Sequence, residues 1–394
     1  MTTRREFLTA AAATTLASVT APSALSAAEP PVRLGFSIAK TGMFASAAQS
    51  QVDTYNFWKD QVNAAGGLDV AGKKRPVEFV SYDDQGNPAQ AAKIYEKLIT
   101  EDKVDLLLAP WGTSMHIGVA PVVERFKFPL IGNSAASAEL RKLKPGYIWF
   151  ATADFPDRVA KQLPLLLKAS NIKSIALISN VLDFTKEVKG FLEPALKEQG
   201  IEVRVNEEYP PSLTDMTALL SKVKQANPDG VVALAYPPDS VLYVRTAKEL
   251  GLPSPFQFCL VGPGSDFFHK VLGTAADGIV TMGQWSPKRN AEAQAFNEAY
   301  IAKVKELPDY LDSVEAYDSV QILAEAVKTA GLDRQKLRDT IAHGRFETII
   351  GPIQFTGVEN LVTPAGFLQI QSGVPQQIWP PQDAVAQWQP KKGY

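Results

Sequence analysis

Short apolar runs alternate with longer amphipathic stretches along the chain after residue 31. The apolar runs are rich in Val, Ile and Leu at consecutive positions, which is typical of strands that are buried on both faces of a parallel sheet. The stretches between them have the length and the apolar spacing of helices. The predicted buried strands lie at residues 32–39, 77–82, 104–109, 175–179, 231–235 and 279–282.

Two of the intervening helices have clear boundary signals. Asn87 precedes Pro88, which predicts Asn87 as the N-cap of a helix and Pro88 as its first residue. A second helix is predicted between residues 214 and 227, where the sequence Asn-Pro-Asp-Gly of residues 227–230 ends it. Strand, helix and strand in this order predict parallel, doubly wound sheets with helices on both faces.

The alternation occurs twice, over residues 32–150 and residues 170–282, so we expect two similar α/β lobes. A length of 394 residues also favours two domains over one. The last third differs, because long helices are predicted at residues 291–307 and 313–330 and a shorter one at 333–343. A hairpin-like tail follows over residues 351–371.

Composition narrows the class of protein. With 45% hydrophobic and 21% charged residues, a soluble globular protein is expected. The 40 Lys and Arg residues nearly balance the 42 Asp and Glu residues, so no general positive field exists to bind nucleic acid or an anionic membrane. Cys259 is the only cysteine, which excludes an internal disulfide and the cysteine spacing of zinc and iron–sulfur sites. We expect neither a metal nor a cofactor.

The first 28 residues have the pattern of an export signal. Arg4 and Arg5 precede a mildly apolar stretch rich in Ala and Thr, residues 9–25, and small residues follow it. This pattern is typical of a twin-arginine signal peptide, with a predicted cleavage after Ala28. No second apolar run approaches the roughly 18 residues of a membrane span, and no lipid-anchor cysteine follows. We therefore expect a soluble protein in the periplasm.

Five short motifs occur in the order found in a known family. They are Asn-Ala-Ala-Gly-Gly-Leu (63–68), Tyr-Asp-Asp-Gln-Gly-Asn-Pro (82–88), Tyr-Pro-Pro (209–211), Ala-Ala-Asp-Gly (275–278) and Glu-Ala-Tyr-Asp (315–318). With them, almost the whole chain after the signal resembles the periplasmic solute-binding proteins of ABC importers for branched-chain amino acids and related compounds. The resemblance implies the type I periplasmic binding fold, in which two αβα lobes are joined by three hinge crossovers.

By position, the crossovers implied by the resemblance lie near residues 151–153, 283–285 and 349–352. Lobe 1 would contain residues 29–151 and 285–348, and lobe 2 would contain residues 152–284 and 349–394. Such a protein closes on a ligand between its lobes and presents the closed shape to a membrane protein. The resemblance therefore implies a monomeric binding protein and not an enzyme. Its implied partners are a small carboxylate ligand and an ABC permease in the inner membrane. Periplasmic sensors have the same fold, and the sequence does not distinguish a role in transport from a role in sensing.

Two loops of lobe 1 leave the carboxyl ends of predicted strands and enter helices, where backbone N–H groups favour an anion. In the family these loops, residues 109–114 and 132–137 here, hold the ligand carboxylate through hydroxyl groups and main-chain amides. By position that role falls on Thr113, Ser114, Ser134 and Ala135. The same hydroxyl groups also suit helix capping, which is compatible with ligand binding.

Two positions that bind the ligand ammonium in amino-acid binders of the family have different residues here. Amino-acid binders of the family usually hold the ligand ammonium with a threonine in the second loop and an acidic residue in a lobe 2 loop. Here the second loop has Ala135 and Ala136, and the lobe 2 loop, residues 261–265, has Gly264 and no acid. A buried ammonium without an acidic partner is costly, so we expect an α-amino acid to be held poorly. Asp266 is predicted to cap the next helix, although a shifted loop would let it bind the ammonium.

Aromatic side chains follow the carboxyl ends of four predicted strands. They are Phe44, Trp111, Phe184 and Tyr236. Flat side chains on several walls of a pocket suit an aromatic or apolar organic acid. We favour such an acid as the ligand, with a branched-chain or other amino acid as the alternative. The competing interpretation of each aromatic residue is packing between a loop and a helix.

Signatures of an enzyme are lacking. The sequence has no GxSxG, P-loop, GxGxxG or HExxH motif. His116 follows Ser114 by two residues, but no acid is placed to orient it, and we expect it on the surface of its helix. Asp83 and Asp84 are predicted to form the turn before the Pro88 helix and not a metal site. A hydrolase is the least favoured function.

Overall fold

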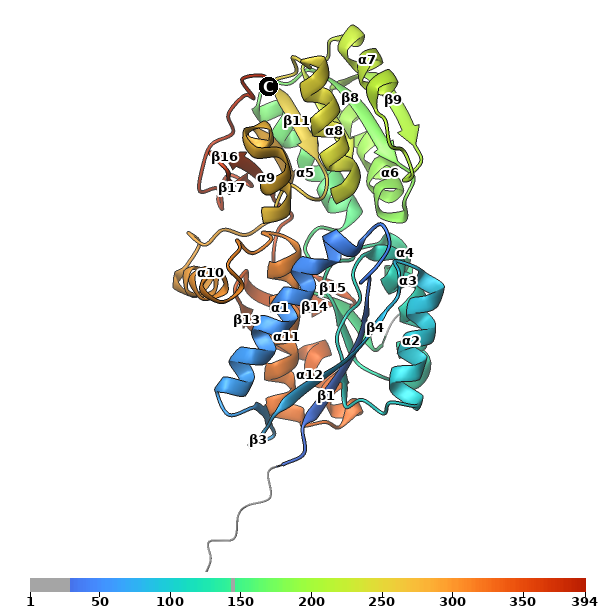
Figure 1. Cartoon of the computed structure of the whole chain (residues 1–394), viewed down its shortest axis with the longest axis vertical. Coiled ribbons are helices and arrows are strands. Elements are labelled where there is room, and N and C mark those ends of the chain that lie inside the picture. The colour runs from blue at the N-terminus through green and yellow to red at the C-terminus, as the bar shows by residue number, and fades with distance from the viewer. Residues whose placement is uncertain (1–28, 143–145) are drawn as a thin grey trace, which may run out of the picture.

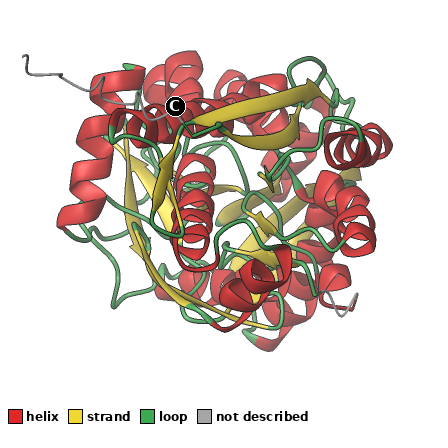
Figure 2. Cartoon of the chain, turned by 90° about the horizontal axis from the view of Figure 1, so that it is seen from below, coloured by secondary structure: helices red, strands yellow, loops and turns green. Residues whose placement is uncertain are grey.

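The computed structural model describes residues 29–142 and 146–394, so the predicted signal peptide lies outside the described residues. Two lobes, each a sheet system covered by helices, are stacked along the long axis of the molecule (Figure 1). Figure 2, turned by 90°, shows strands on the inside and helices around them. This is the two-lobe α/β architecture that the strand–helix alternation predicts.

Lobe 1 contains two sheets and a small hairpin. The first sheet has the order β4-β1-β5 with parallel strands, and the second has the order β13-β14-β15-β7-β6. In the second sheet β6, β7 and β15 are parallel, whereas β14 and β13 are added antiparallel. The strands are β1 (Val32–Ile38), β2 (Leu68–Val70), β3 (Lys73–Arg75), β4 (Val77–Asp83), β5 (Leu106–Leu107), β6 (Leu130–Gly132), β7 (Ile148–Phe150), β13 (Arg345–Thr348), β14 (Gly351–Thr356) and β15 (Glu359–Asn360).

The helices of lobe 1 pack in pairs, α1 against α11 and α2 against α3. Helix α2 begins as predicted, because the Asn87 side chain accepts hydrogen bonds from the N–H groups of Ala89 and Gln90. Asp83 and Asp84 form the turn before it. The helices are α1 (Ala45–Ala64), α2 (Pro88–Thr100), α3 (Thr113–Phe126), α4 (Ala138–Lys142), α10 (Ala291–Val304), α11 (Asp312–Ala330) and α12 (Arg334–His343).

Lobe 2 is built on one seven-stranded sheet of order β17-β16-β12-β11-β10-β8-β9. The strands from β9 to β12 are parallel, and β16 and β17 form an antiparallel edge. Its strands are β8 (Ser174–Asn180), β9 (Glu202–Tyr209), β10 (Gly230–Leu234), β11 (Phe256–Cys259), β12 (Ile279–Met282), β16 (Phe367–Gln371) and β17 (Val374–Trp379). Its helices are α5 (Pro156–Ala169), α6 (Asp183–Glu198), α7 (Thr217–Ala226), α8 (Pro237–Leu250), α9 (Asp266–Leu272) and the 3₁₀ turn η1 (Gly273–Ala276).

Both faces of the lobe 2 sheet are buried, as its continuous apolar runs predict. Along β8, Ile175 and Leu177 join the large apolar cluster that extends into lobe 1, whereas Ala176 and Ile178 join a second cluster on the opposite face. Helices on both sides therefore cover this sheet. Among the described residues, none of the helices is both long enough and apolar enough to span a membrane.

The chain passes between the lobes three times, after β7, after β12 and after β15. The third passage differs from the prediction, which placed it near residues 349–352. β14 and β15 instead extend the lobe 1 sheet, because β15 pairs with both β14 and β7, where Glu359 lies opposite Phe150. The chain therefore enters lobe 2 only between Asn360 and Phe367.

Candidate ligand-binding site

A small cavity, which can hold the centres of water-sized molecules over about 30 Å³, lies between the two lobes. It lies beyond the carboxyl ends of β6, β10 and β12, where open α/β sheets bind their ligands. Both lobes and the first connection between them contribute side chains. The lining residues are Trp111, Thr113, Ser134, Ala135, Ala136, Thr152, Asp154, Phe184, Tyr236, Val261, Met282, Leu311, Asp312 and Glu315.

Most of the residues predicted from the sequence line this cavity, and three lie beside it. Phe44 packs behind the cavity wall, with its ring centroid 5.4 Å from that of Trp111 and 5.8 Å from that of Tyr236. Gly264 lies where the lobes meet, and its carbonyl accepts the Tyr310 N–H at 3.1 Å. Ser114 lies at the rim. The predicted residues that line the cavity are Trp111, Thr113, Ser134, Ala135, Ala136, Phe184 and Tyr236.

The start of α3 forms one end of the cavity. Gly112 precedes it with a φ of 91°, a left-handed conformation that favours glycine. The N–H groups of the first turn, beginning at Thr113, have no acceptor inside the helix and carry its positive dipole end. The Ala135 N–H also makes no hydrogen bond within the described residues. These groups together suit a carboxylate.

Ser134 lines the cavity, but its hydroxyl group is used within lobe 1. The Ser134 Oγ accepts the Gly112 N–H at 3.1 Å and donates to Gln51 Oε1 at 3.0 Å. Gln51 in turn donates to the Ala109 carbonyl at 2.9 Å. This network joins the two anion-binding loops to α1, so Ser134 holds the loops in position.

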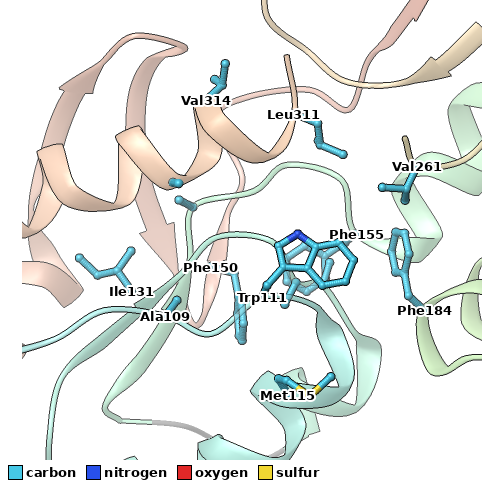
Figure 3. Close-up of a cluster of buried hydrophobic side chains, with 14 of the residues drawn as sticks. Ala109, Trp111, Met115, Ile131, Phe150, Phe155, Phe184, Val261, Leu311 and Val314 are labelled. Carbon is cyan, nitrogen blue, oxygen red and sulfur yellow. The ribbon is translucent and has the colours of Figure 1, made fainter. Parts of the chain in front are cut away.

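Aromatic side chains from opposite lobes face each other across the cavity. The ring centroids of Trp111 in lobe 1 and Tyr236 in lobe 2 lie 6.0 Å apart in an edge arrangement. The Tyr236 phenol also hydrogen-bonds to Thr113 of lobe 1, while burial raises the pKa of Tyr236. Phe184 and Val261 of lobe 2 face Trp111 in Figure 3. Several walls of the cavity are therefore flat and apolar.

Three buried carboxyl groups form another wall, which we call the acid wall: Asp154, Asp312 and Glu315. Their residues are only 1%, 4% and 3% exposed. Asp312 Oδ2 accepts the Trp111 Nε1–H at 2.8 Å. Within the described residues, both carboxylate oxygens of Asp154 and the Oε1 of Glu315 have no hydrogen-bond partner. The cavity lining therefore includes three acidic residues that the sequence analysis did not name.

The sequence analysis missed these acids because it looked for one in the lobe 2 loop. Asp154 lies on the first connection between the lobes, directly before α5. Asp312 and Glu315 stand in the first turn of α11 on the same helix face, since they are three residues apart. The Glu-Ala-Tyr-Asp motif, which contains Glu315, was the available signal.

Burial raises the pKa of Asp154 to about 7. The Gly366 N–H and the positive charge of Arg158 oppose this shift. Arg158 itself donates to the carbonyls of Ala153 and Asn360, at 3.2 and 2.8 Å, and so does not form an ion pair with Asp154.

The pKa values of the two α11 acids, Asp312 and Glu315, are shifted in the same direction. Burial raises the pKa of Glu315, and the charge of Asp154 adds to the effect. Burial also raises the pKa of Asp312, with the charge of Asp309 as a further cause and the Trp111 hydrogen bond opposing it. In each case burial favours the protonated form of the carboxyl group over the ionised form.

Two other sequence expectations differ from the structure. Ser265, and not Asp266, caps α9. Asp266 forms an ion pair with Lys270, with 2.8 Å between the charged atoms, and it does not line the cavity. His116 is fully buried and not on the helix surface. Its Nδ1 lies 2.9 Å from the Gly112 carbonyl oxygen, and burial lowers its pKa to about 4, so this histidine is neutral.

Polar contacts join the lobes at the rim of the cavity. Asp183 Oδ2 on α6 of lobe 2 accepts the Ser114 hydroxyl at 2.6 Å. Glu187, one turn further along α6, accepts the Ala138 N–H at 2.7 Å and the Ser137 hydroxyl. We call these the rim contacts. They hold the α3 and α4 helix starts of lobe 1 against lobe 2.

Two lobes with a cavity between them, lined by residues of both, have the architecture of a two-domain binding protein. The chain belongs to the periplasmic binding protein family, whose model matches residues 31–374. It is 25% identical over 302 residues to the leucine-, isoleucine-, valine-, threonine-, and alanine-binding protein of Pseudomonas aeruginosa. The match covers 75% of this chain and 78% of that protein. It is therefore the substrate-binding protein of an ABC transporter and not an enzyme.

Solved structures share the fold. The substrate-binding protein LivJ of Streptococcus pneumoniae, in complex with isoleucine, matches with a TM-score of 0.80 and 25% identity over 88% of this chain and 97% of LivJ. A solute-binding protein of R. palustris, in complex with benzoate, matches with a TM-score of 0.79 and 19% identity over 88% of this chain and 95% of that protein.

The rim contacts predict an effect on affinity without contact to the ligand. Glu187→Ala removes two hydrogen bonds that exist only while the lobes are closed, and a hydrogen bond to a charged group contributes about 1.5–3 kcal/mol. We expect ligand affinity to fall roughly tenfold. Glu198→Ala, at an exposed position of the same helix, is the control and should leave the affinity unchanged in isothermal titration calorimetry. Equal affinities for both variants would show that the rim contacts do not stabilise closure.

The raised pKa of Asp154 predicts a pH-dependent stability. The pKa of Asp154 is 3.8 in the unfolded chain and about 7 in the folded protein, so the folded protein keeps this proton more strongly. The contribution of Asp154 to the free energy of unfolding is therefore greatest below pH 3.8, and it is lost as the pH rises through about 7. Between pH 5 and pH 8, Asp154→Asn should therefore gain about 2–3 kcal/mol relative to the wild type, since one pKa unit corresponds to about 1.4 kcal/mol. Urea denaturation of the ligand-free proteins at both pH values measures this difference. Glu325→Gln, an exposed change on α11, should show no such gain, and a pH-independent difference for Asp154→Asn contradicts the assignment.

Proposed function

We propose that this protein captures a small organic carboxylate with an aromatic or apolar body between its two lobes and delivers it to an ABC permease. The observation that carries the proposal is the start of α3, where free N–H groups and the Thr113 hydroxyl face a cavity with aromatic walls. An enclosed carboxylate there gains charge-assisted hydrogen bonds, each of about 1.5–3 kcal/mol. The aromatic walls bury the rest of the ligand.

Both lobes contribute to the same cavity, which explains how binding leads to delivery. A ligand between Thr113 of lobe 1 and Tyr236 of lobe 2 makes its full set of contacts only when the lobes are closed. It therefore shifts the hinge equilibrium toward the closed form, and the rim contacts add to that form. The permease then distinguishes loaded from empty protein by shape.

The names and bound ligands of the relatives support a carboxylate. The P. aeruginosa relative is named for binding amino acids, and the solved neighbours hold isoleucine and benzoate. All of these compounds have a carboxylate group, whereas the rest of the ligand differs. The proposal also includes export by the twin-arginine route with cleavage after Ala28, and action in the periplasm as a monomer.

Matched ligands test the anion end. We expect carboxylates such as benzoate, phenylpropanoate or leucine to raise the melting temperature, and the corresponding primary amides to bind at least roughly tenfold more weakly. Thr113→Val keeps the side-chain shape but removes the hydroxyl, and it should lower carboxylate affinity by roughly tenfold. Thr214→Val, at an exposed site in lobe 2, is the matched control. A ligand that binds equally well as acid and amide contradicts the proposal.

A further inference from the structure

The cavity is too small for the ligand that the proposed function requires. A space of about 30 Å³ for the centres of water-sized molecules holds about two water molecules. The rings of Trp111 and Tyr236, with 6.0 Å between their centroids, are also in contact, so no ligand body fits between them. One wall of the cavity must therefore move when a carboxylate with an aromatic or apolar body binds.

A larger space, which we call the outer pocket, lies beside the cavity. By the same measure it extends over about 280 Å³, and it is lined by the first turns of α1, by Pro237 and by Asp312, among others. Asp312 also lines the cavity. Phe44 directly precedes α1, and Tyr236 directly precedes Pro237. The contacting rings of Phe44, Trp111 and Tyr236 therefore stand at the boundary between the cavity and the outer pocket.

One polar contact holds the Trp111 side chain at this boundary. Its Nε1–H, the single donor of an indole, donates to Asp312 Oδ2 at 2.8 Å. Asp312 is itself held in place, because its N–H donates to Asp309 Oδ1 at 3.2 Å. Gly112 follows Trp111, and apart from its chain neighbours no atom of the described residues lies within 4 Å of the place where a Cβ would stand. The backbone beside Trp111 therefore has room to turn.

Two movements make room for a ligand body, and they differ in what they break. Separation of the lobes breaks the rim contacts of Asp183 and Glu187 and the hydrogen bond from the Tyr310 N–H to the Gly264 carbonyl. A swing of the Trp111 indole breaks one hydrogen bond and leaves the others in place. Hydrogen bonds to charged groups are among the stronger ones, so the swing is the less costly movement.

We infer that the Trp111 side chain is a gate between the cavity and the outer pocket, and that its hydrogen bond to Asp312 is a latch that keeps the gate closed until a ligand binds. The ligand displaces the indole toward the outer pocket while the lobes stay closed, and its body then lies between the indole and Tyr236. Asp312 is thus a positioning residue, and Trp111 determines how large a ligand body the site admits. The inference rests on the proposed function for the ligand, whereas the latch exists without it.

Nuclear magnetic resonance of the indole N–H groups tests the latch without a ligand. The protein has six tryptophan residues, and Trp111→Phe identifies the signal of Trp111. In Asp312→Leu, which lacks an acceptor, we expect the Trp111 N–H to exchange with solvent at least tenfold faster than in the wild type. Asp312→Asn keeps an acceptor oxygen and should restore slow exchange. Gln162→Leu is the matched control, because Trp379 of lobe 2 donates to Gln162 Oε1 at 2.8 Å, and it should change the signal of Trp379 alone.

Ligands of different size provide the second readout. Acetate, leucine, benzoate and phenylpropanoate are titrated into each variant. In the complex with the tightest of the three larger carboxylates, the Trp111 N–H signal should move toward its position in Asp312→Leu, because the latch is broken. The preference for that carboxylate over acetate should rise about tenfold in Asp312→Leu, where no latch has to be broken, and should stay close to the wild-type value in Asp312→Asn and Gln162→Leu.

A second variant guards against a folding defect in Asp312→Leu. Trp111→Leu replaces the gate by a smaller side chain that needs no latch, so it should raise the preference for the larger carboxylate in the same way. Trp379→Leu, which shortens a tryptophan of lobe 2, should leave that preference unchanged. An unchanged preference in Trp111→Leu overturns the gate.

The outcomes separate the gate from the proposed function. If the larger carboxylates bind but leave the Trp111 signal in place, the lobes move and not the gate, so the gate is overturned and the proposed function stands. If Asp312→Leu leaves the exchange of the Trp111 N–H unchanged, the latch is overturned as well. If none of the carboxylates binds while Asp312→Leu accelerates the exchange and Asp312→Asn restores it, the latch is supported and the ligand assignment fails.

Discussion

The carboxyl groups of Asp154, Asp312 and Glu315 are buried between the lobes, and the described residues that line the cavity include no Lys, Arg or His to balance their charge. Ionised carboxyl groups that are removed from water need a compensating charge or a proton. The raised pKa of Asp154 is the expected response of a carboxyl group that is buried and forms no ion pair within the described residues. A ligand in the cavity contacts both lobes and therefore stabilises the closed form more than the open one, which couples binding to closure.

The fold places opposite electrostatic preferences around one cavity. The start of α3 presents free N–H groups, because strand β5 ends just before it and Gly112 allows the sharp turn. The acid wall comes from elements that lie elsewhere in the chain, namely the first connection and the start of α11. Trp111 links them, since it belongs to the α3 loop and donates to Asp312. Thr113 at the start of α3 and the three residues of the acid wall thus line the same cavity.

Much of the fold follows from the sequence, because Val-, Ile- and Leu-rich runs and cap residues act locally. The strands β1, β4, β8, β10 and β12 and the Asn87 cap of α2 were predicted for that reason. The third passage between the lobes was not predicted, because it depends on β15, a strand of 2 residues whose partner β7 lies some 200 residues earlier in the chain. Pairing over such a distance has no local signal.

The residues of the candidate site also differ in how well the sequence predicts them. The loops at strand ends indicated Trp111 and Thr113, because their position follows from the local order of strand and helix. The acid wall was missed, because Asp154 and Glu315 meet only after the chain has crossed between the lobes twice. A charged residue in an amphipathic helix is usually on its solvent face, so nothing local marks Glu315 as buried.

A crystal structure of the protein with a bound carboxylate ligand tests the central claim most directly. The account predicts the ligand carboxylate at the N–H groups that begin α3, and the body of the ligand between Trp111 and Tyr236. A ligand whose carboxylate lies against Asp154, Asp312 and Glu315 would contradict it.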